Sequence, residues 1–238
     1  MIGKYLYCWH PRLYPGQDVV AYAQKLGVRG VVLLDGSGES VIERAVEVFD
    51  GRVYLWKGPN AFLPHNAVET TQRMARVMTR LGGAGFVTDA ETAPQWRGNM
   101  RELQAFGEAM KAAKQSGLDV GFTSFPLWPY VRQLGQFASF GSPQMYARRG
   151  PQDYQLFGRW RRKWDESYPA VNPSIWPQGH RSRRRVPAEQ REYLRLFEGE
   201  TVIVFQSPVS PVGSPSFNVL SDFFSGGNTI VPKCEPPA

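Results

Sequence analysis

The strongest constraint on the fold of this chain is a regular alternation of short apolar runs with longer helical patterns. Runs rich in Val, Leu, Tyr and Phe predict strands at residues 4–9, 30–35, 53–58, 85–91, 120–125, 142–147, 171–176 and 201–206. Apolar residues at three-to-four spacing predict helices at residues 18–26, 39–49, 66–81, 98–116, 130–136, 153–166, 187–196 and 217–224. A strand followed by a helix favours parallel crossovers, and eight such units favour an α/β fold, a single (β/α)8 TIM-type barrel with an irregular last unit.

The length of 238 residues fits one barrel domain. We expect the barrel to span residues 1–226 and residues 227–238 to form a C-terminal tail. The alternative fold is a doubly wound open sheet. No Gly-x-Gly-x-x-Gly motif follows any of the strands, which weakens the dinucleotide-binding form of that alternative.

The composition is that of an ordinary globular protein, with 42% hydrophobic and 21% charged residues. No apolar run reaches the ~20 residues that span a bilayer, and the first residues lack the apolar stretch of a signal peptide. We therefore expect a chain made in the cytoplasm, which acts on a cell wall only after release or as part of a phage particle. The two cysteines, Cys8 and Cys234, are too few for a disulfide framework or a metal cluster. A single disulfide bond between them is one alternative.

Residues 85–92, GFVTDAET, carry two carboxylates one residue apart, Asp89 and Glu91. Because side chains alternate along a strand, both acids share one face, which we expect to look into the barrel mouth. Two close carboxylates resist joint ionisation, so one keeps its proton near neutral pH and can protonate a glycosidic oxygen. We expect Glu91, nearer the strand end, to be the acid and Asp89 to be its partner. The alternative is a structural role for Asp89 as a helix cap or as the partner of an arginine.

Other predicted strand ends carry side chains that suit a sugar, whose hydroxyls form hydrogen bonds and whose apolar face packs on aromatic rings. The expected substrate-binding residues are Asp35, Trp56, Ser124, Gln144, Tyr146, Trp176 and Gln206. The tryptophans at or just beyond strand ends are Trp9, Trp56, Trp96, Trp128 and Trp176. Packing within the barrel or its loops is the other interpretation of each tryptophan.

The formal charge of +7 comes from one fifth of the sequence. Residues 148–195 hold 12 Arg and Lys against 5 Asp and Glu, whereas the rest of the chain holds 16 of each. This asymmetry predicts an anionic partner, either a wall polymer, nucleic acid or a lipid surface. The expected anion-binding residues beside the cleft are Arg148, Arg149, Arg181 and Arg183. The stretch RWRRKW at 159–164 is either a solvated helix face or a patch for nucleic acid or a membrane surface.

The sequence predicts no cofactor and no metal site. The three histidines, His10, His65 and His180, lie far apart in Pro-rich loops. A metal site would need His10 and His180 to converge with Asp35, and no short ligand spacing supports that arrangement. The sequence also has no Gly-x-Ser-x-Gly nucleophile elbow.

Several of these motifs resemble barrel glycosidases that cut cell-wall amino sugars: Asp-x-Glu on the fourth strand, PQMY on the sixth, and the openings LGVRGVVLLDG and LDVGFTSFP. The nearest likeness is to glycoside hydrolase family 25 lysozymes and the related barrels of phage lysins, and it covers most of the chain as a pattern of strands. The resemblance implies that Glu91 donates the proton and that Asp89 positions or stabilises the substrate. It also implies that Gln144 and Tyr146 line the cleft.

The chain departs from these families at named positions. Family 25 enzymes carry an aspartate at the end of the first strand, where this chain reads CWHP, so that role is empty or passes to Asp35. Chitinase-type family 18 barrels are the second likeness, and they carry further aspartates upstream on the fourth strand. Ala84 and Val87 stand at those positions here.

The leading functional hypothesis is a glycoside hydrolase that cleaves an amino-sugar polymer such as peptidoglycan. The alternative is a catalytically inactive barrel that serves as a binding or structural component of a virion or secretion apparatus through its basic face. Nucleic-acid binding through residues 148–195 is the third hypothesis, and it predicts an affinity that falls steeply with salt.

Overall fold

The computed structural model describes residues 3–8, 18–90, 93–168, 170–179, 184–206 and 209–226. The strands are β1 (Lys4–Cys8), β2 (Gly30–Leu34), β3 (Val53–Trp56), β4 (Gly85–Asp89), β5 (Asp119–Ser124), β6 (Phe140–Pro143), β7 (Ser174–Ile175) and β8 (Val202–Phe205). The α-helices are α1 (Val19–Leu26), α2 (Glu39–Val48), α3 (Ala67–Leu81), α4 (Ala93–Trp96), α5 (Met100–Gln115), α6 (Val131–Gly135), α7 (Tyr154–Asp165), α8 (Pro187–Arg195) and α9 (Pro215–Ser225). Short 3₁₀ turns are η2 (Pro59–Ala61) and η3 (Gly150–Asp153).

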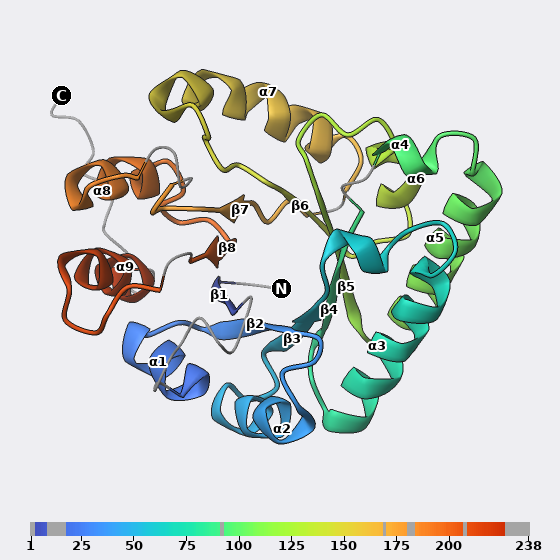
Figure 1. Cartoon of the computed structure of the whole chain (residues 1–238), viewed down its shortest axis with the longest axis horizontal. Helices are drawn as coiled ribbons and strands as arrows, with labels where there is room; N and C mark the ends of the chain where they lie inside the picture. The colour runs from blue at the N-terminus through green and yellow to red at the C-terminus, as the bar shows by residue number, and fades with distance from the viewer. Residues whose placement is uncertain are drawn as a thin grey trace, which may run out of the picture.

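The strands form one parallel sheet in the order β6-β5-β4-β3-β2-β1-β8-β7. Its two edges meet through bridges from Gly141 to Val171 and from Gln144 to Ser174, so the sheet closes almost completely. Helices surround the strands on the outside (Figure 1). The predicted (β/α)8 barrel is therefore confirmed, and the doubly wound open sheet is wrong.

The predicted strands and helices are present, and the sixth and seventh strands differ most from the expected bounds. β6 pairs with β5 from Phe140 to Pro143, whereas the sequence predicts a strand at 142–147. The Gln144 N–H still donates to the Ser124 carbonyl of β5 over 3.1 Å, and the next residue turns to β7, where the Met145 N–H donates to the Ser174 carbonyl over 2.8 Å. This turn closes the barrel against β7, which has only two residues in its ladder.

Alternation along the strands divides the buried side chains between two cores. The inner core contains Tyr5, Tyr7, Val32, Tyr54, Val87, Phe140 and Ile203. Aromatic rings fill the interior, and Gly121 makes room for them because a Cβ atom there would overlap the Phe140 ring. The outer core lies between sheet and helices and buries Trp96 and Trp128, so packing is the correct interpretation of these two tryptophans.

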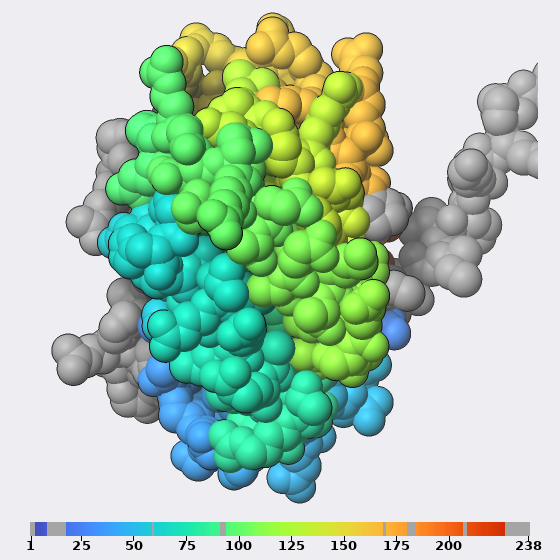
Figure 2. Space-filling view, turned by 90° about the vertical axis from the view of Figure 1, so that its right-hand side faces the viewer, coloured from blue at the N-terminus to red at the C-terminus, as the bar shows by residue number. Residues whose placement is uncertain are grey.

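The helices that cover the sheet have ordinary start and stop signals. Asp18 begins α1 by accepting hydrogen bonds from the N–H groups of Val20 and Ala21, and Gly27 ends it at φ 73°. α3 and α5 pack against each other and form part of the outer wall that faces the viewer in Figure 2. Among the described residues, no helix is long and apolar enough to cross a membrane.

Candidate functional site at the carboxyl ends of the strands

The carboxyl end of β4 places Asp89 inside the barrel. Asp89 follows Val87 on the inner face and is only 3% exposed. Its register partner is Thr123 on β5, whose own partner is Ser142 on β6. The hydroxyls of Ser142 and Ser174 lie 2.7 Å apart, so a polar layer crosses four neighbouring strands beneath the barrel mouth.

Aromatic side chains stand at the same end of the barrel as this polar layer. The Tyr7 ring lies 4.8 Å from Trp56 and 5.9 Å from Phe205, measured between ring centroids. Phe205 also contacts Trp176 at 5.1 Å and Tyr146 at 6.0 Å. All of these rings except Tyr7 are only partly buried. Partly exposed rings beside buried hydroxyls and a carboxylate are the side chains that bind a sugar ring.

A cavity of about 370 Å³ adjoins the mouth between the β5–α6 loop, the loop after β6, and α7. Gln144 and Tyr146 line both the mouth and this cavity. The apolar wall includes Phe125 and Leu127, which are 37% and 51% exposed. Its cationic residues are Arg148, Arg149 and Arg159. The Arg148 guanidinium lies over the Phe125 ring, 5.3 Å from its centroid. We call this cavity with its three arginines the rim pocket.

The buried guanidinium of Arg185 joins the two loops that carry Tyr146 and Trp176. It donates hydrogen bonds to the Ala147 carbonyl over 2.8 Å and to the Trp176 carbonyl over 2.7 Å. Its other face lies 4.3 Å from the Tyr193 ring centroid. Ala147 itself adopts a positive φ of 44°, an uncommon conformation for a residue with a Cβ atom. The loop conformation next to Arg148 is thus held by a side chain rather than by strand pairing.

The structure separates the sequence-predicted lining residues into two sets. Gln144, Tyr146, Trp176 and Trp56 gather at the mouth with Asp89. Asp35, Ser124 and Gln206 each follow an inward-facing residue, so alternation turns them toward the helices. Gln206 donates to the Tyr22 hydroxyl of α1 over 2.7 Å.

Asp35 is bound in an ion-pair cluster on the helix side of the sheet. It accepts hydrogen bonds from Arg73 of α3, one of them over 2.8 Å, and Lys57 Nζ lies 3.3 Å away. Burial alone would raise the pKa of Asp35, but the hydrogen bonds and charge of Arg73, with the charge of Lys57, lower it below the usual value. The cluster holds Asp35 away from the mouth.

Several predicted residues lie outside the described residues: Glu91, Arg181 and Arg183, together with Trp9, His10, His180 and Cys234. Their expected roles stay predictions. In the ranges that the structure does describe, no group of three or more His, Cys, Asp or Glu side chains is placed to hold a metal ion.

Sequence reasoning missed the hydroxyl layer of Thr123, Ser142 and Ser174 and the two aromatic rings of Tyr7 and Phe205. Each lies on the inner face of a strand whose neighbours are also apolar or small. Only the sheet register shows that these side chains meet. Arg185 was also missed, because it stands in the run HRSRRR, where the sequence suggests exposed charge.

No family model matches the sequence, and no curated protein matches it either. Solved structures with a similar fold include a chitinase from Bacteroides thetaiotaomicron, with a TM-score of 0.66, 12% identity and coverage of 94% of this chain and 96% of that one. A GH18 chitinase from Pseudoalteromonas aurantia has a TM-score of 0.65 and 12% identity, over 93% of this chain and 99% of that one. A GH113 beta-1,4-mannanase has a TM-score of 0.63 and 10% identity, over 94% and 98%.

Barrels with unrelated activities are also similar, among them an orotidine 5'-phosphate decarboxylase from Pyrococcus horikoshii OT3, with a TM-score of 0.57 and 11% identity over 93% of this chain and 99% of that one. Identity this low shows the fold and nothing finer. The chain is therefore a TIM-type barrel whose similar structures include glycoside hydrolases of two families, and the likeness to family 25 lysozymes stays a prediction from the sequence.

Proposed function

We propose that this protein is a glycoside hydrolase that cleaves an amino-sugar polymer such as peptidoglycan. One observation carries the proposal: Asp89 is buried at the carboxyl end of β4, on the inner face of the barrel end that also carries a group of aromatic rings. The sequence adds a second carboxylate, Glu91, two residues further along the same strand direction. Active sites of TIM barrels lie at this end of the strands.

The proposed reaction uses the two carboxylates in different roles. Glu91 donates its proton to the glycosidic oxygen as the bond from that oxygen to the anomeric carbon breaks. Asp89 stabilises the positive charge that develops on the sugar, and its buried position strengthens this interaction because little water screens it. A water molecule then adds to the anomeric carbon and returns a proton to Glu91, which restores the enzyme.

The lining of the mouth supports a carbohydrate substrate. Exposed parts of Trp56, Trp176 and Tyr146 offer flat apolar surfaces for sugar rings, and the amide of Gln144 lies between the mouth and the rim pocket. The rim pocket adds guanidinium groups that suit carboxylates on the polymer or on its peptides. Chitinases and a mannanase of similar fold act on related polymers, as their names state. We propose that the protein reaches its wall substrate after release or on a phage particle.

The decisive test compares purified peptidoglycan treated with the wild type, Glu91→Gln and Asp89→Asn, with turbidity and newly formed reducing ends as readouts. A lost general acid lowers rates by about 10²–10⁴-fold, and we expect that loss for Glu91→Gln. Glu43→Gln, an exposed glutamate on α2, is the matched control and should be fully active. Circular dichroism establishes that each variant is folded.

Two results would overturn the proposal. Full activity of Glu91→Gln would remove the acid from the mechanism. Binding of peptidoglycan by the wild type without any reducing ends, on peptidoglycan or on chitin oligosaccharides, would favour the catalytically inactive barrel instead. One feature favours the catalytically inactive barrel: the family 18 pattern has an aspartate at position 87, where the inner face of this chain carries Val87.

A further inference from the structure

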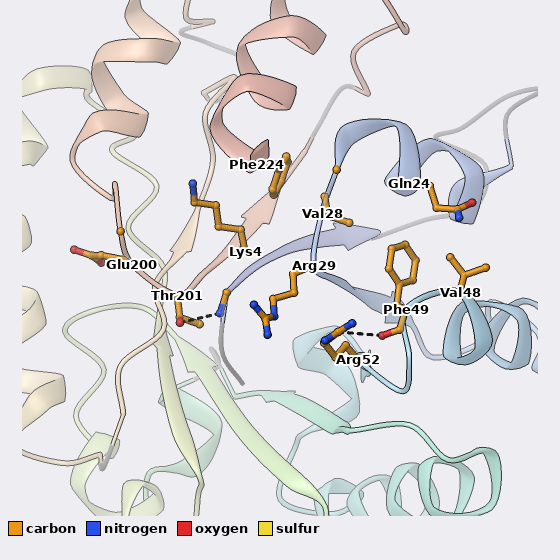
Figure 3. Close-up of a pocket in the computed structure, with 13 residues that line it drawn as sticks. Lys4, Gln24, Val28, Arg29, Val48, Phe49, Arg52, Glu200, Thr201 and Phe224 are labelled. Carbon is orange, nitrogen blue, oxygen red and sulfur yellow. Dashed lines mark hydrogen bonds between the residues drawn. The ribbon is translucent and has the colours of Figure 1, made fainter. Parts of the chain in front are cut away.

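A second cavity lies at the opposite end of the barrel from Asp89. Its volume is about 700 Å³, and it opens where β8, β1, β2 and β3 begin (Figure 3). The residues that start these strands or directly precede them are Thr201, Lys4, Arg29 and Arg52. Nothing in the proposed glycosidase mechanism uses this end of the barrel.

The parallel register brings three cations to one rim of the cavity. The Arg29 N–H donates to the Lys4 carbonyl over 3.0 Å, and the Arg52 carbonyl accepts from Val31 over 3.1 Å. Lys4, Arg29 and Arg52 therefore stand on three adjacent strands at nearly the same level. In the view of Figure 3 no carboxylate is drawn between Arg29 and Arg52, and the Lys4 side chain extends away from both, where its ammonium donates to the Phe223 carbonyl.

The positive charges in the cavity are poorly neutralised. Arg29 makes no ion pair with any residue that the structure describes. Arg52 lies 3.8 Å from Asp50, whose side chain is 90% exposed, and its Nε donates to the Phe49 carbonyl over 3.1 Å. The Lys4 ammonium donates to the Phe223 carbonyl and lies 3.9 Å from the centroid of the Phe223 ring. These contacts fix the cations but leave their charge largely unpaired.

The single carboxylate that lines the cavity already has a partner. Glu200 forms a two-pronged ion pair with Arg161 of α7, one hydrogen bond of which measures 2.6 Å. Three cations and one carboxylate give the lining residues a net charge of +2. Burial lowers the pKa of Lys4, and the negative charge of Glu198 opposes this shift only in part.

Four other lining residues are apolar, and Gln24 and Thr201 add polar groups to the lining. Val28 and Phe49 are buried, and Val48 and Phe224 complete the wall. A volume of this size is typical of small-molecule sites, which combine an apolar wall with a few convergent polar groups. The cations suit a dianion and the wall suits an apolar body attached to it. We infer that this cavity binds a small organic phosphate, with its phosphate group on Arg29 and Arg52 and its apolar portion against Phe49 and Phe224.

A purely structural role does not explain this arrangement as well. Residues at the amino ends of barrel strands commonly serve stability, and stabilising arginines are paired with carboxylates, as Arg161 is with Glu200. Neighbouring like charges repel each other, and a bound anion would relieve that repulsion. A guanidinium group forms two parallel hydrogen bonds with a carboxylate or a phosphate, but a phosphate monoester has three terminal oxygens and up to two charges, which suits two arginines better than a single carboxylate does.

The test is isothermal titration of the full chain with phenyl phosphate, inorganic phosphate and phenol at pH about 7.5, where a phosphate group carries about −1.5 to −2 charges. We expect saturable one-to-one binding of phenyl phosphate, weaker binding of inorganic phosphate and none of phenol. Arg29→Gln and Arg52→Gln should each weaken phenyl phosphate binding by about tenfold or more, because each removes charge-assisted hydrogen bonds. Both side chains are at least partly exposed, so the variants should fold normally.

Arg76→Gln is the matched control, since it removes the same charge from an exposed position on α3. Its binding of phenyl phosphate should equal that of the wild type. The inference is overturned by the absence of saturable binding, by an equal loss of affinity in Arg76→Gln, or by full binding in the Arg29→Gln/Arg52→Gln double variant. Equal affinity for inorganic and phenyl phosphate would remove the apolar portion of the proposed ligand. Because the readout is binding, the result does not depend on glycosidase activity.

Discussion

At the scale of single residues, Asp35 has the most clearly defined electrostatic environment in the described structure. Its folded-state pKa lies below the ordinary value of about 3.9, because Arg73 and Lys57 outweigh the effect of burial. A depressed folded pKa contributes stability above the unfolded pKa, and that contribution is lost as the pH falls through the folded pKa. Asp35→Asn should therefore lower the free energy of unfolding at pH 7 by about 1–3 kcal/mol. The difference should shrink below pH about 4.

Urea unfolding of both proteins between pH 7 and acid conditions measures this dependence. Asp222→Asn, at an exposed position on α9, controls for the loss of one negative charge and should change stability by less than about 0.5 kcal/mol. A difference for Asp35→Asn that stays constant with pH would mean that the ion pair contributes nothing and that only the lost hydrogen-bond geometry matters.

The same residue shows what the sequence leaves undecided. Residues 30–34 read GVVLL, so apolar side chains occupy both faces of β2, and the pattern cannot tell which of them faces inward. Asp35 was expected at the mouth because it follows a strand, yet its position in the alternation turns it toward α3. On β4 the alternation of Gly85, Val87 and Asp89 predicts that these residues face inward, and Val87 lies in the inner core.

At the scale of elements, the packing of β6 beside β5 depends on a glycine. A Cβ atom at Gly121 would overlap the Phe140 ring, and both residues pair directly in the ladder. Gly121→Ala should destabilise the protein by about 1–3 kcal/mol through overpacking. Phe140→Leu in the same chain should recover part of that loss, because the smaller side chain vacates the overlapped space, and a double-mutant cycle in urea measures the coupling.

Gly158→Ala provides the control for the glycine substitution itself. Gly158 lies inside α7, and a Cβ atom there meets nothing within 4 Å. This substitution should stabilise the protein by about 0.5–1 kcal/mol through helix propensity. Destabilisation by Gly121→Ala that Phe140→Leu does not reduce would show that backbone strain, and not the ring, limits the site.

Element positions were predictable from the sequence to a larger extent than the site. The strands and helices could be predicted because each depends on a local periodicity that the sequence of that segment contains. The short ladder of β7 depends instead on where β6 turns after Pro143, a long-range closure that no local pattern encodes. The stretch 159–164 shows the same limit: Trp164 is buried in the outer core and Arg161 pairs with Glu200, whereas Arg159 lines the rim pocket.

At the scale of the whole molecule, positive charge gathers at both ends of the barrel. The sequence count finds only one excess, in residues 148–195, which supply the arginines of the rim pocket. The second cluster, at Arg29 and Arg52, comes from a part of the chain in which charges balance. It exists because the barrel brings the starts of successive strands together.

The positive charge at the mouth end should favour an anionic substrate over a neutral one. Arg148→Gln/Arg149→Gln/Arg159→Gln should raise the KM for peptidoglycan by about tenfold at low ionic strength, because long-range attraction of an anionic polymer is lost. The KM for neutral chitin oligosaccharides should stay unchanged. Arg76→Gln/Arg101→Gln/Arg191→Gln removes equal charge from exposed helix positions and should leave both KM values near those of the wild type.

The salt dependence of the KM distinguishes a role of the rim-pocket arginines from a general effect of net charge. The screening length falls from about 10 Å at 0.1 M to about 3 Å at 1 M, so the difference between the wild type and the rim-pocket variant should narrow steadily as salt is added. A penalty that persists at high salt, or one that the control variant shares, would contradict a role for these arginines in holding an anionic substrate. Steady-state kinetics on both substrates across this range distinguishes the cases, because only a charged polymer responds to a distant guanidinium group.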